Sequence, residues 1–356
     1  MIKVRIRKKF PASEKSAGFT LDVDFTAPCG ITVLFGPRGA GKTLVLDAIA
    51  GFLHPDEGRI LLDDAILYDG ATGVHLRPQR RNCGYIVPNY ALFPHMSVRR
   101  NLEFAVRGLA RLERRRRVRE LLERYHLSEV AECLPREISA IQKLRCAIAR
   151  ALARAPQALL LDEPACGLEP SLRASFYSWL QQVRDEHAIP ILLATHDFEE
   201  CFESAGEVLM IREGKIAQSG SLRRVLEQPA SVEVARMLGV FNLLPAEIRA
   251  LDPSRNSSRL KVGEVELSGV YYPGRFLGDR VWLCVRSDEL VAAPQNGKPG
   301  PNQMAVQLVR AVERLQTVRL EFAGGIVVEM KRALFESQKH NKEWVVEFPP
   351  GALRVI

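Results

Sequence analysis

The residues best suited to chemistry lie in a glycine-rich segment near the N-terminus. The segment reads Gly36-Pro37-Arg38-Gly39-Ala40-Gly41-Lys42-Thr43. It matches the pattern Gly-x-x-x-x-Gly-Lys-Ser/Thr and lies between an apolar run typical of a strand and one typical of a helix. Such glycines let backbone N–H groups surround phosphates, while Lys42 would reach the β- and γ-phosphates and Thr43 would offer its hydroxyl to Mg²⁺. Because pattern and flanking elements agree, we predict an ATP site rather than a chance glycine-rich turn.

Two carboxylates follow a second apolar run. Leu159-Leu160-Leu161 is followed directly by Asp162 and Glu163. An acidic pair after a strand is by itself more often a strand end that meets solvent. Downstream of a phosphate-binding loop, the pair predicts that Asp162 holds Mg²⁺ through its water shell. Glu163 would then orient and deprotonate the attacking water.

A histidine follows a third apolar run. The run spans Ile189 to Ala194, and His196 comes two residues later. A lone histidine is more often structural than functional. Here the run predicts a strand that ends at the same sheet edge as the carboxylates. We therefore predict that His196 contacts the γ-phosphate and the attacking water.

The elements that must position these residues can be read from the same runs. Residues 31–35, 158–161 and 189–194 are apolar without polar alternation, which is typical of strands buried on both faces. Residues 44–50 predict a helix that Gly51 stops. Residues 97–150 are helical and charged. We predict an α/β P-loop NTPase core over residues 1–233, with a helical subdomain inserted.

The character of the chain changes after Pro229. Short alternating segments such as 319–322 and 327–330 are separated by turn clusters at 293–301 and 349–351. This pattern predicts a small all-β barrel, OB-like, over residues 259–356. Residues 234–258 would be the linker.

Composition bounds the class of protein. The chain has 356 residues, of which 47% are hydrophobic and 26% charged, as in a soluble protein of two domains. No apolar run approaches the roughly 20 residues that span a bilayer. Residues 1–7 alternate like an edge strand and contain no signal-peptide stretch. The seven cysteines form no Cys-x-x-Cys pair, which argues against a metal site and suits a reducing compartment. We expect a cytoplasmic protein.

The net charge of +8 suggests acidic partners. Part of it lies in the arginine-rich run 111–119. A nucleic-acid patch is one reading, but glutamates interrupt the run and no aromatic residues interleave with it. We expect a solvated helix face and no nucleic-acid partner.

The order of these motifs resembles the ATP-binding-cassette (ABC) family over residues 1 to about 240. The order is the phosphate-binding loop, Leu92-Phe93-Pro94-His95, a signature region at 138–142, Asp162-Glu163 and His196. The resemblance implies that two such domains pair head to tail, with ATP between one phosphate-binding loop and the other's Ser139 and Gln142. It also implies transmembrane permease subunits as partners, met near residues 92–98. The protein would then be peripheral, at the cytoplasmic face of the inner membrane.

Among such proteins, the chain looks most like the molybdate importers. In that group a C-terminal domain of the MOP/TOBE type binds the oxyanion. Segments 285–290 and 304–307 look like strand starts of that domain, and Arg286, Ser287 and Lys331 are candidate anion contacts. Plain surface placement is the simpler reading for each. Sulfate, polyamine and sugar importers also carry C-terminal β-domains, so the substrate stays open between molybdate or a related oxyanion and these others.

The sequence departs from the family pattern in three places. Pro88 stands where a glutamine is expected, and Asn89 could take its place if the loop shifted by one residue. The signature Leu-Ser-Gly-Gly-Gln reads Ile138-Ser139-Ala140-Ile141-Gln142, so both glycines are lost. The β-branched Ile141 should crowd the approach to phosphate or force the backbone elsewhere. The loop Ser-Ala-Leu-Asp reads Cys166-Gly167-Leu168-Glu169.

Three functions remain to be separated. The first is an ATP-hydrolysing importer subunit with Glu163 as base, as a homodimer. The second is a regulatory ATP-binding subunit with little hydrolysis that pairs with an active partner in a heterodimer, and the losses at Pro88 and Ile141 favour it. The third is an ATP-dependent chromosome protein, which the Leu92–His95 segment and the β-rich C-terminus argue against.

Overall fold

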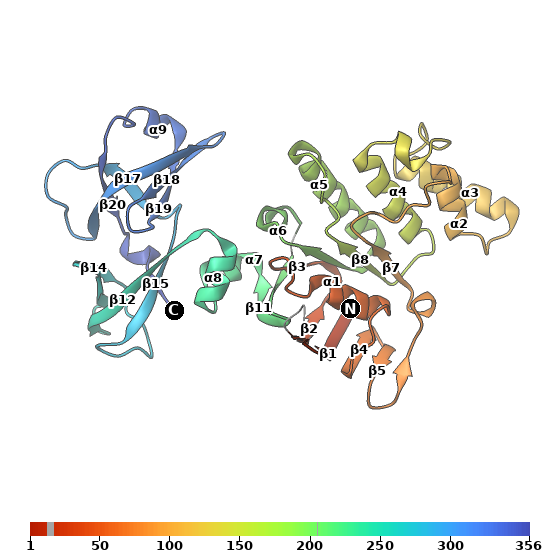
Figure 1. Ribbon diagram of the computed structural model, residues 1–356, viewed down its shortest axis with the longest axis horizontal. Helices are drawn as coiled ribbons and strands as arrows, with labels where there is room; N and C mark the ends of the chain where they lie inside the picture. The colour runs from red at the N-terminus through yellow and green to blue at the C-terminus, as the bar shows by residue number, and fades with distance from the viewer. Residues whose placement is uncertain (13–17, 205) are drawn as a thin grey trace. The chain divides into compact units, whose positions relative to one another are not determined.

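The computed structural model of the protein describes residues 1–12, 18–204 and 206–356. These residues form two compact units, Met1–Val225 and Leu226–Ile356. The first unit mixes strands and helices, and the second consists mainly of strands (Figure 1). The fold class is therefore the predicted one: an α/β core with a helical subdomain, followed by an all-β unit.

A mixed sheet of 11 strands runs through the described part of the first unit. Its strands lie in the order β6 (Val74–His75), β5 (Ala65–Asp69), β4 (Glu57–Leu62), β1 (Ile2–Phe10), β2 (Phe19–Ala27), β11 (Lys215–Ser221), β10 (Glu207–Arg212), β3 (Gly30–Phe35), β9 (Pro190–Thr195), β8 (Ala158–Asp162) and β7 (Cys83–Ile86). From β10 to β7, neighbouring strands are parallel. Every residue of β8 and β9 is buried, as their unbroken apolar runs predict.

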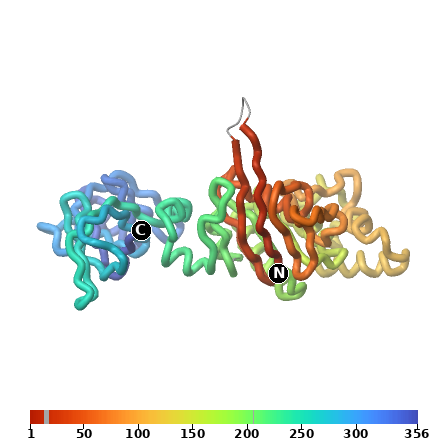
Figure 2. Tube along the Cα trace, turned by 90° about the horizontal axis from the view of Figure 1, so that it is seen from below, coloured from red at the N-terminus to blue at the C-terminus, as the bar shows by residue number. Residues whose placement is uncertain are grey.

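The N-terminal strand corrects one expectation. Residues 1–7 suggested an edge strand, but β1 lies inside the sheet between β2 and β4. Figure 2 shows β1 and β2 as a long hairpin, drawn in red. Ile2, Val4 and Ile6 are buried while the basic residues between them are exposed. Alternation of this kind reports one solvated face, and it does not report whether both strand edges are paired.

Helices cover both faces of the parallel strands. The helix α1 (Lys42–Ala50) packs on β8 and β9, whereas α5 (Pro170–His187) and α6 (Phe198–Ser204) pack on β3 from the other side (Figure 1). As predicted, α1 ends at Gly51, which adopts the left-handed conformation with φ 91°.

The inserted helical subdomain gathers beside β7 (Figure 1). It contains α2 (Val98–Ala105), α3 (Arg111–Arg124) and α4 (Ala140–Leu152), with a 3₁₀ turn at Pro135–Glu137 before α4. Another 3₁₀ turn, Pro78–Arg80, precedes β7. The arginine-rich run lies on α3 and is largely solvent-facing, while Val118, Leu121 and Leu122 bury the other side of that helix. This is the solvated helix face expected from the sequence.

The second unit packs two antiparallel sheets on one core. One sheet has the order β14 (Val265–Gly269), β13 (Ser257–Val262), β12 (Phe241–Asp252), β15 (Arg280–Arg286) and β21 (Arg354–Val355); the other has β16 (Val291–Pro294), β20 (Glu343–Glu347), β17 (Gln303–Glu313), β18 (Thr317–Phe322) and β19 (Val327–Lys331). Its short helices are α8 (Val232–Leu238), α9 (Arg332–Glu336) and a 3₁₀ turn at Pro350–Ala352, while α7 (Leu222–Glu227) spans the point in the sequence where the two units divide. Two buried asparagines join the sheets: Asn242 bonds to Val327, and Asn302 bonds to Ser268.

Two expectations for this region differ from the structure. Residues 234–258, expected as a linker, contain most of α8 and all of β12, the central strand of its sheet. The polar Asn242 lies on the buried face of β12 while Leu243 and Pro245 lie on the other face, so the segment lacks the regular apolar–polar alternation that marks a half-buried strand. Residues 285–290 end β15 and turn, rather than starting a strand.

No helix within the described ranges is long and apolar enough to cross a membrane.

Candidate ATP site

The ends of three parallel strands bring the predicted residues together. Phe35 of β3 lies opposite Thr195 of β9, and Asp162 of β8 lies opposite Ala194 of β9. Because parallel strands in register end at one edge, the segments that follow them share that edge. The phosphate-binding loop, the carboxylate pair and His196 are these segments.

The phosphate-binding loop leaves the N-terminus of α1 open. Gly41 occupies the N-cap position with φ 106°, and no side chain caps the helix. The first N–H groups of a helix have no partner inside it, so they remain available to an anion. Glycine is required sterically at Gly36, where a Cβ atom would lie 2.2 Å from the carbonyl oxygen of Ile211. The loop therefore has the open geometry that its sequence pattern predicts.

Lys42 is buried within this loop. Its Nζ donates to the carbonyl oxygens of Gly36 at 2.8 Å and Pro37 at 3.1 Å, and it lies 3.8 Å from Oε1 of Glu163. Burial lowers the pKa of Lys42, and the negative charges of Glu163 and Asp162 oppose that shift. The ammonium group is thus held at the loop in a poorly solvated place, where it attracts phosphate strongly.

Thr43 and Asp162 meet directly. The Thr43 hydroxyl donates to Oδ2 of Asp162 at 2.8 Å. Oδ1 of Asp162 is buried and has no hydrogen-bond partner among the described residues. Burial raises the pKa of this carboxyl group, and the bond from Thr43 partly offsets the shift. An orphaned carboxylate oxygen beside a hydroxyl is a place that a cation would stabilise.

These oxygens fit Mg²⁺. The ion prefers hard oxygen ligands and is usually held by one or two protein groups together with phosphates and water. Within the described ranges, no group of three or more His, Cys, Asp or Glu residues could hold a metal by itself. A Mg²⁺ ion at Thr43 and Asp162 would therefore take its other ligands from a nucleotide and from water.

Glu163 stands in a strained conformation beside His196. Its φ of 45° lies in the left-handed region, and its N–H bonds to the carbonyl oxygen of Ala194 at 2.9 Å. Oε1 of Glu163 lies 3.0 Å from Nδ1 of His196. Both side chains line a cavity of about 140 Å³ together with Arg38 and Cys166. Strain of this kind persists where surrounding contacts hold it, and it is concentrated at functional sites.

Arg173 belongs to this neighbourhood, and the sequence gave no motif for it. Its Nε donates to the carbonyl oxygen of Leu168 at 3.2 Å, and its Nη1 donates to Asp197 at 2.8 Å. It thus ties the loop after Glu163 to the loop that carries His196. Only its spacing of five residues after Leu168, on the first turns of α5, could have pointed to it.

The signature residues lie on another helix. Ser139 caps α4: its Oγ accepts from the N–H of Gln142 at 3.4 Å, while its own N–H donates to Oε1 of Gln142 at 3.0 Å. Ala140 and Ile141 form the first turn between them. Among the described residues, no hydrogen bond or ion pair joins Ser139 or Gln142 to the phosphate-binding loop. In this chain the two residues bind each other, as a capping box.

The departures near β7 and in the second unit can also be placed. Pro88 and Asn89 are exposed in the turn after β7. Among the candidate anion contacts, Arg286 is paired with Asp288, Ser287 is buried, and Lys331 is exposed before α9. Arg286 is thus already ion-paired, and Ser287 is buried and carries no charge.

Comparisons with known proteins agree with this geometry. The family model described as ABC transporter matches residues 21–166. A molybdenum import ATP-binding protein, ModC of Rhizobium johnstonii, is 33% identical over 284 residues, which are 79% of this chain and 79% of that protein. A sulfate/thiosulfate import ATP-binding protein, CysA 1 of Chromobacterium violaceum, is 36% identical over 307 residues, or 84% and 81% of the two chains.

Two further similarities concern the range of substrates named for the relatives and the fold of the first unit. A spermidine/putrescine import ATP-binding protein, PotA of Vibrio cholerae, is 35% identical over 289 residues, which are 80% of this chain and 74% of that protein. A solved dimeric ATP-binding cassette in a post-hydrolysis state, bound to ADP and Pi, has a TM-score of 0.54 at 24% identity and covers 63% of this chain and 99% of its own. The import proteins that this chain resembles are thus named for several different substrates.

Proposed function

The chain belongs to the family of ABC transporter ATP-binding proteins, and from that premise we propose that it is the ATP-hydrolysing subunit of an importer for molybdate or a related oxyanion. One observation carries the hydrolytic part. Lys42, the Thr43–Asp162 pair and the Glu163–His196 pair lie at one edge of the sheet, around the open N-terminus of α1.

We assign the following roles to these residues. The N–H groups of the phosphate-binding loop and Lys42 bind the β- and γ-phosphates. Glu163 accepts the proton of the attacking water, and His196 orients Glu163 and contacts the γ-phosphate. Thr43 and Asp162 would hold Mg²⁺, which when bound supplies positive charge to the phosphate oxygens.

The second half of such a site would come from a second cassette. Ser139 and Gln142 would contact the nucleotide bound to a partner domain, in a homodimer or a heterodimer. Segment 92–98 would meet transmembrane permease subunits, which would place the chain at the cytoplasmic face of the membrane. The import proteins named above support this assignment by similarity.

The oxyanion would bind the second unit on a basic face of β12, β13 and β15. A shallow hollow of about 370 Å³ is lined there by Arg249, Lys261 and Arg280 beside Trp282. Arg249 pairs with Glu247, whereas Lys261 and Arg280 form no ion pair among the described residues. Lys261 of β13 and Arg280 of β15 both lie opposite Glu247 of β12, one on each side of it. Three cations against one carboxylate leave this face with a net positive charge, which attracts an anion.

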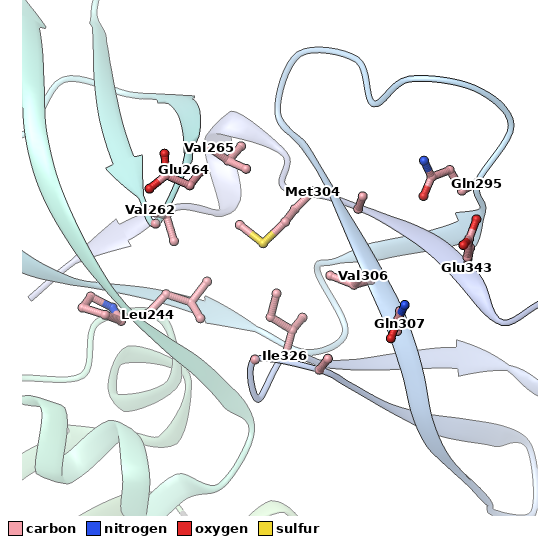
Figure 3. Close-up of a pocket in the computed structure, with 15 residues that line it drawn as sticks. Leu244, Val262, Glu264, Val265, Gln295, Met304, Val306, Gln307, Ile326 and Glu343 are labelled. Atoms are coloured by element: carbon pink, nitrogen blue, oxygen red, sulfur yellow. The ribbon is translucent and has the colours of Figure 1, made fainter.

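The larger cleft of this unit is unsuited to an anion. Its volume is about 640 Å³, and Leu244, Val262, Met304, Val306 and Ile326 form much of its lining. Figure 3 shows Glu264 and Glu343 on opposite sides of it, with Met304 and Ile326 between them. Among the residues that the structure describes, no Lys, Arg or His lines the cleft. Two carboxylates and no cation would repel molybdate.

Calorimetric titration of the full chain with sodium molybdate tests the oxyanion assignment. We expect binding that the double variant Lys261→Gln/Arg280→Gln loses and that Lys298→Gln, on the loop after β16, retains. Sodium sulfate and spermidine are titrated in parallel. Tighter binding of spermidine than of either oxyanion would replace the proposed substrate class.

A second candidate has its own supporting observation. Ile141 occupies the first turn of α4 where a glycine would let backbone approach phosphate, and Pro88 offers no side-chain donor. A chain of this kind could bind ATP, hydrolyse little, and pair with an active partner.

Steady-state phosphate release from MgATP separates the two candidates. For the hydrolytic function we expect turnover by the purified chain that Glu163→Gln lowers by about 10² to 10⁴, the usual contribution of a general base, with ATP affinity retained. ATP binding without turnover in the wild type would favour the regulatory function.

A further inference from the structure

A chain of buried and partly buried polar contacts begins beside Glu163. Tyr90 is 9% exposed, and its hydroxyl donates to the carbonyl oxygen of Pro164 at 3.2 Å. Pro164 follows Glu163 directly in the sequence. Any shift of the Glu163 loop that moves this carbonyl must therefore strain or break the bond to Tyr90.

Arg150 extends the chain from Tyr90. Its Nη2 donates to the carbonyl oxygen of Tyr90 at 3.1 Å, and its Nη1 donates to Oδ1 of Asn101 at 3.4 Å. The guanidinium also lies over the ring of Phe93, 5.3 Å from its centre. Arg150 lies in the last turn of α4, the helix that begins at Ser139.

Asn101 completes the chain at segment 92–98. It is fully buried, and its Nδ2 donates to the carbonyl oxygens of Phe93, Met96 and Ser97 at 3.0 to 3.2 Å. Its Oδ1 accepts from the N–H of Phe93 at 2.9 Å. One amide side chain thus fixes the backbone of segment 92–98 at Phe93, Met96 and Ser97.

The backbone between these contacts is strained. Tyr90 has φ 62° and Ala91 has φ 44°, so two consecutive residues with side chains occupy the left-handed region. Single residues of this kind are disfavoured, and a pair persists only where other contacts hold it. The contacts of Tyr90 are the ones that can hold this backbone in place. The preceding residues Pro88 and Asn89 are exposed and make no side-chain hydrogen bond among the described residues.

We propose that Tyr90, Arg150 and Asn101, here called the Tyr90 relay, are positioning residues that join the Glu163 loop to segment 92–98. Nucleotide binding at the phosphate-binding loop then changes the backbone order of segment 92–98. The inference rests on the proposed function in one respect, the binding of nucleotide at Lys42. Tyr90 stands two residues after Pro88, where a side chain able to make such a link is missing.

Hydrogen exchange of backbone amides tests the relay in the full chain, with Mg²⁺ and the non-hydrolysable analogue AMP-PNP. In the wild type we expect the analogue to slow exchange in peptides covering 36–43 and 92–101. In Tyr90→Phe, the slowing at 36–43 remains, while that at 92–101 falls by about fivefold, the factor that one hydrogen bond of ordinary strength supplies. Arg150→Lys keeps the cation but cannot reach both acceptors in one plane, so its response is intermediate.

Tyr68→Phe is the matched control. The Tyr68 hydroxyl is also buried and also donates to a proline carbonyl, that of Pro55 at 2.9 Å, on a strand outside the relay. It should lose similar stability and keep the wild-type response at 92–101. The relay would be overturned if the analogue slowed exchange at 92–101 equally in Tyr90→Phe and the wild type. It would also be overturned if Tyr68→Phe lost as much of this slowing as Tyr90→Phe. Absence of slowing at 36–43 in the wild type would overturn the proposed function and the relay with it.

Discussion

Two helices of the first unit differ in whether their N-terminal N–H groups are free to bind phosphate. The helix α1 begins at Gly41 in a left-handed conformation, without a side-chain cap. The helix α4 begins at Ser139, and Ser139 and Gln142 bond to each other's backbone N–H groups. Free N–H groups attract an anion, whereas a capping box satisfies them within the helix.

The difference shows which half of a nucleotide site this chain supplies well. Around α1, Lys42, Asp162 and Glu163 are all in place. Around α4, the loss of both glycines removes the freedom for backbone to approach a phosphate closely. We infer that binding of ATP depends on α1, and that the rate of hydrolysis is limited at α4.

The largest effect is expected from removing the positive charge of Lys42 at the N-terminus of α1. Lys42→Ala should weaken ATP binding by about 10- to 100-fold, because hydrogen bonds to charged groups contribute about 1.5–3 kcal/mol. Titration with a fluorescent ATP analogue measures the Kd. The control is Lys8→Ala, which removes a lysine of β1 that is paired with Asp56 and should leave the Kd unchanged. An unchanged Kd in Lys42→Ala would move the ATP site away from α1.

The second largest effect is expected from adding a side chain at Gly41, the residue at the open N-terminus of α1. A Cβ at Gly41 would meet Leu21 Cδ1 at 3.1 Å, and φ is 106°. Gly41→Ala should reduce the free energy of unfolding by about 1–2 kcal/mol and weaken ATP binding as well. Gly73→Ala places the same side chain at φ 72° in open space, so it should lower stability and leave ATP affinity unchanged. Equal ATP affinity in the two variants would contradict the requirement for an open α1.

A third effect depends on pH. Burial raises the pKa of Asp162 in the folded protein, so the ionised carboxylate destabilises the nucleotide-free fold at pH 7. That penalty disappears as the pH falls through the folded pKa toward the unfolded value of about 3.9. Asp162→Asn should therefore raise the Tm at pH 7, with the gain shrinking toward acid pH. The same variant should lose the Tm increase that MgATP gives the wild type. A lower Tm at pH 7 would show that Asp162 stabilises the empty site.

The smallest effect separates capping from catalysis at α4. In the nucleotide-free protein, where only the cap is at stake, Ser139→Ala should reduce the free energy of unfolding by about 1 kcal/mol, the usual loss for a capping serine. Urea unfolding measures the change. Ser231→Ala removes a similar cap from α8 and provides the comparison. A Ser139→Ala variant of full stability would show that the cap seen here contributes little.

The strand ends were predictable because unbroken apolar runs identify buried parallel strands, and such strands end together. This placed Lys42, Asp162, Glu163 and His196 correctly beside one another. The Tyr90 relay was not predictable, because its three residues lie on separate elements and match no local pattern. The expected linker also failed, since β12 owes its place to pairing with β13 and β15, which no local signal reports.

The kcat of Ile141→Gly at saturating MgATP tests most directly whether α4 limits hydrolysis. Ala140→Gly is the matched control, because it adds a glycine to the same turn and keeps the β-branched side chain. If α4 is limiting, Ile141→Gly should raise kcat at least about tenfold, as expected when one preorganised contact to the reacting phosphate is restored, with KM unchanged. A kcat equal to or below that of the wild type would contradict the claim and show that the first turn of α4 is a tolerated variation.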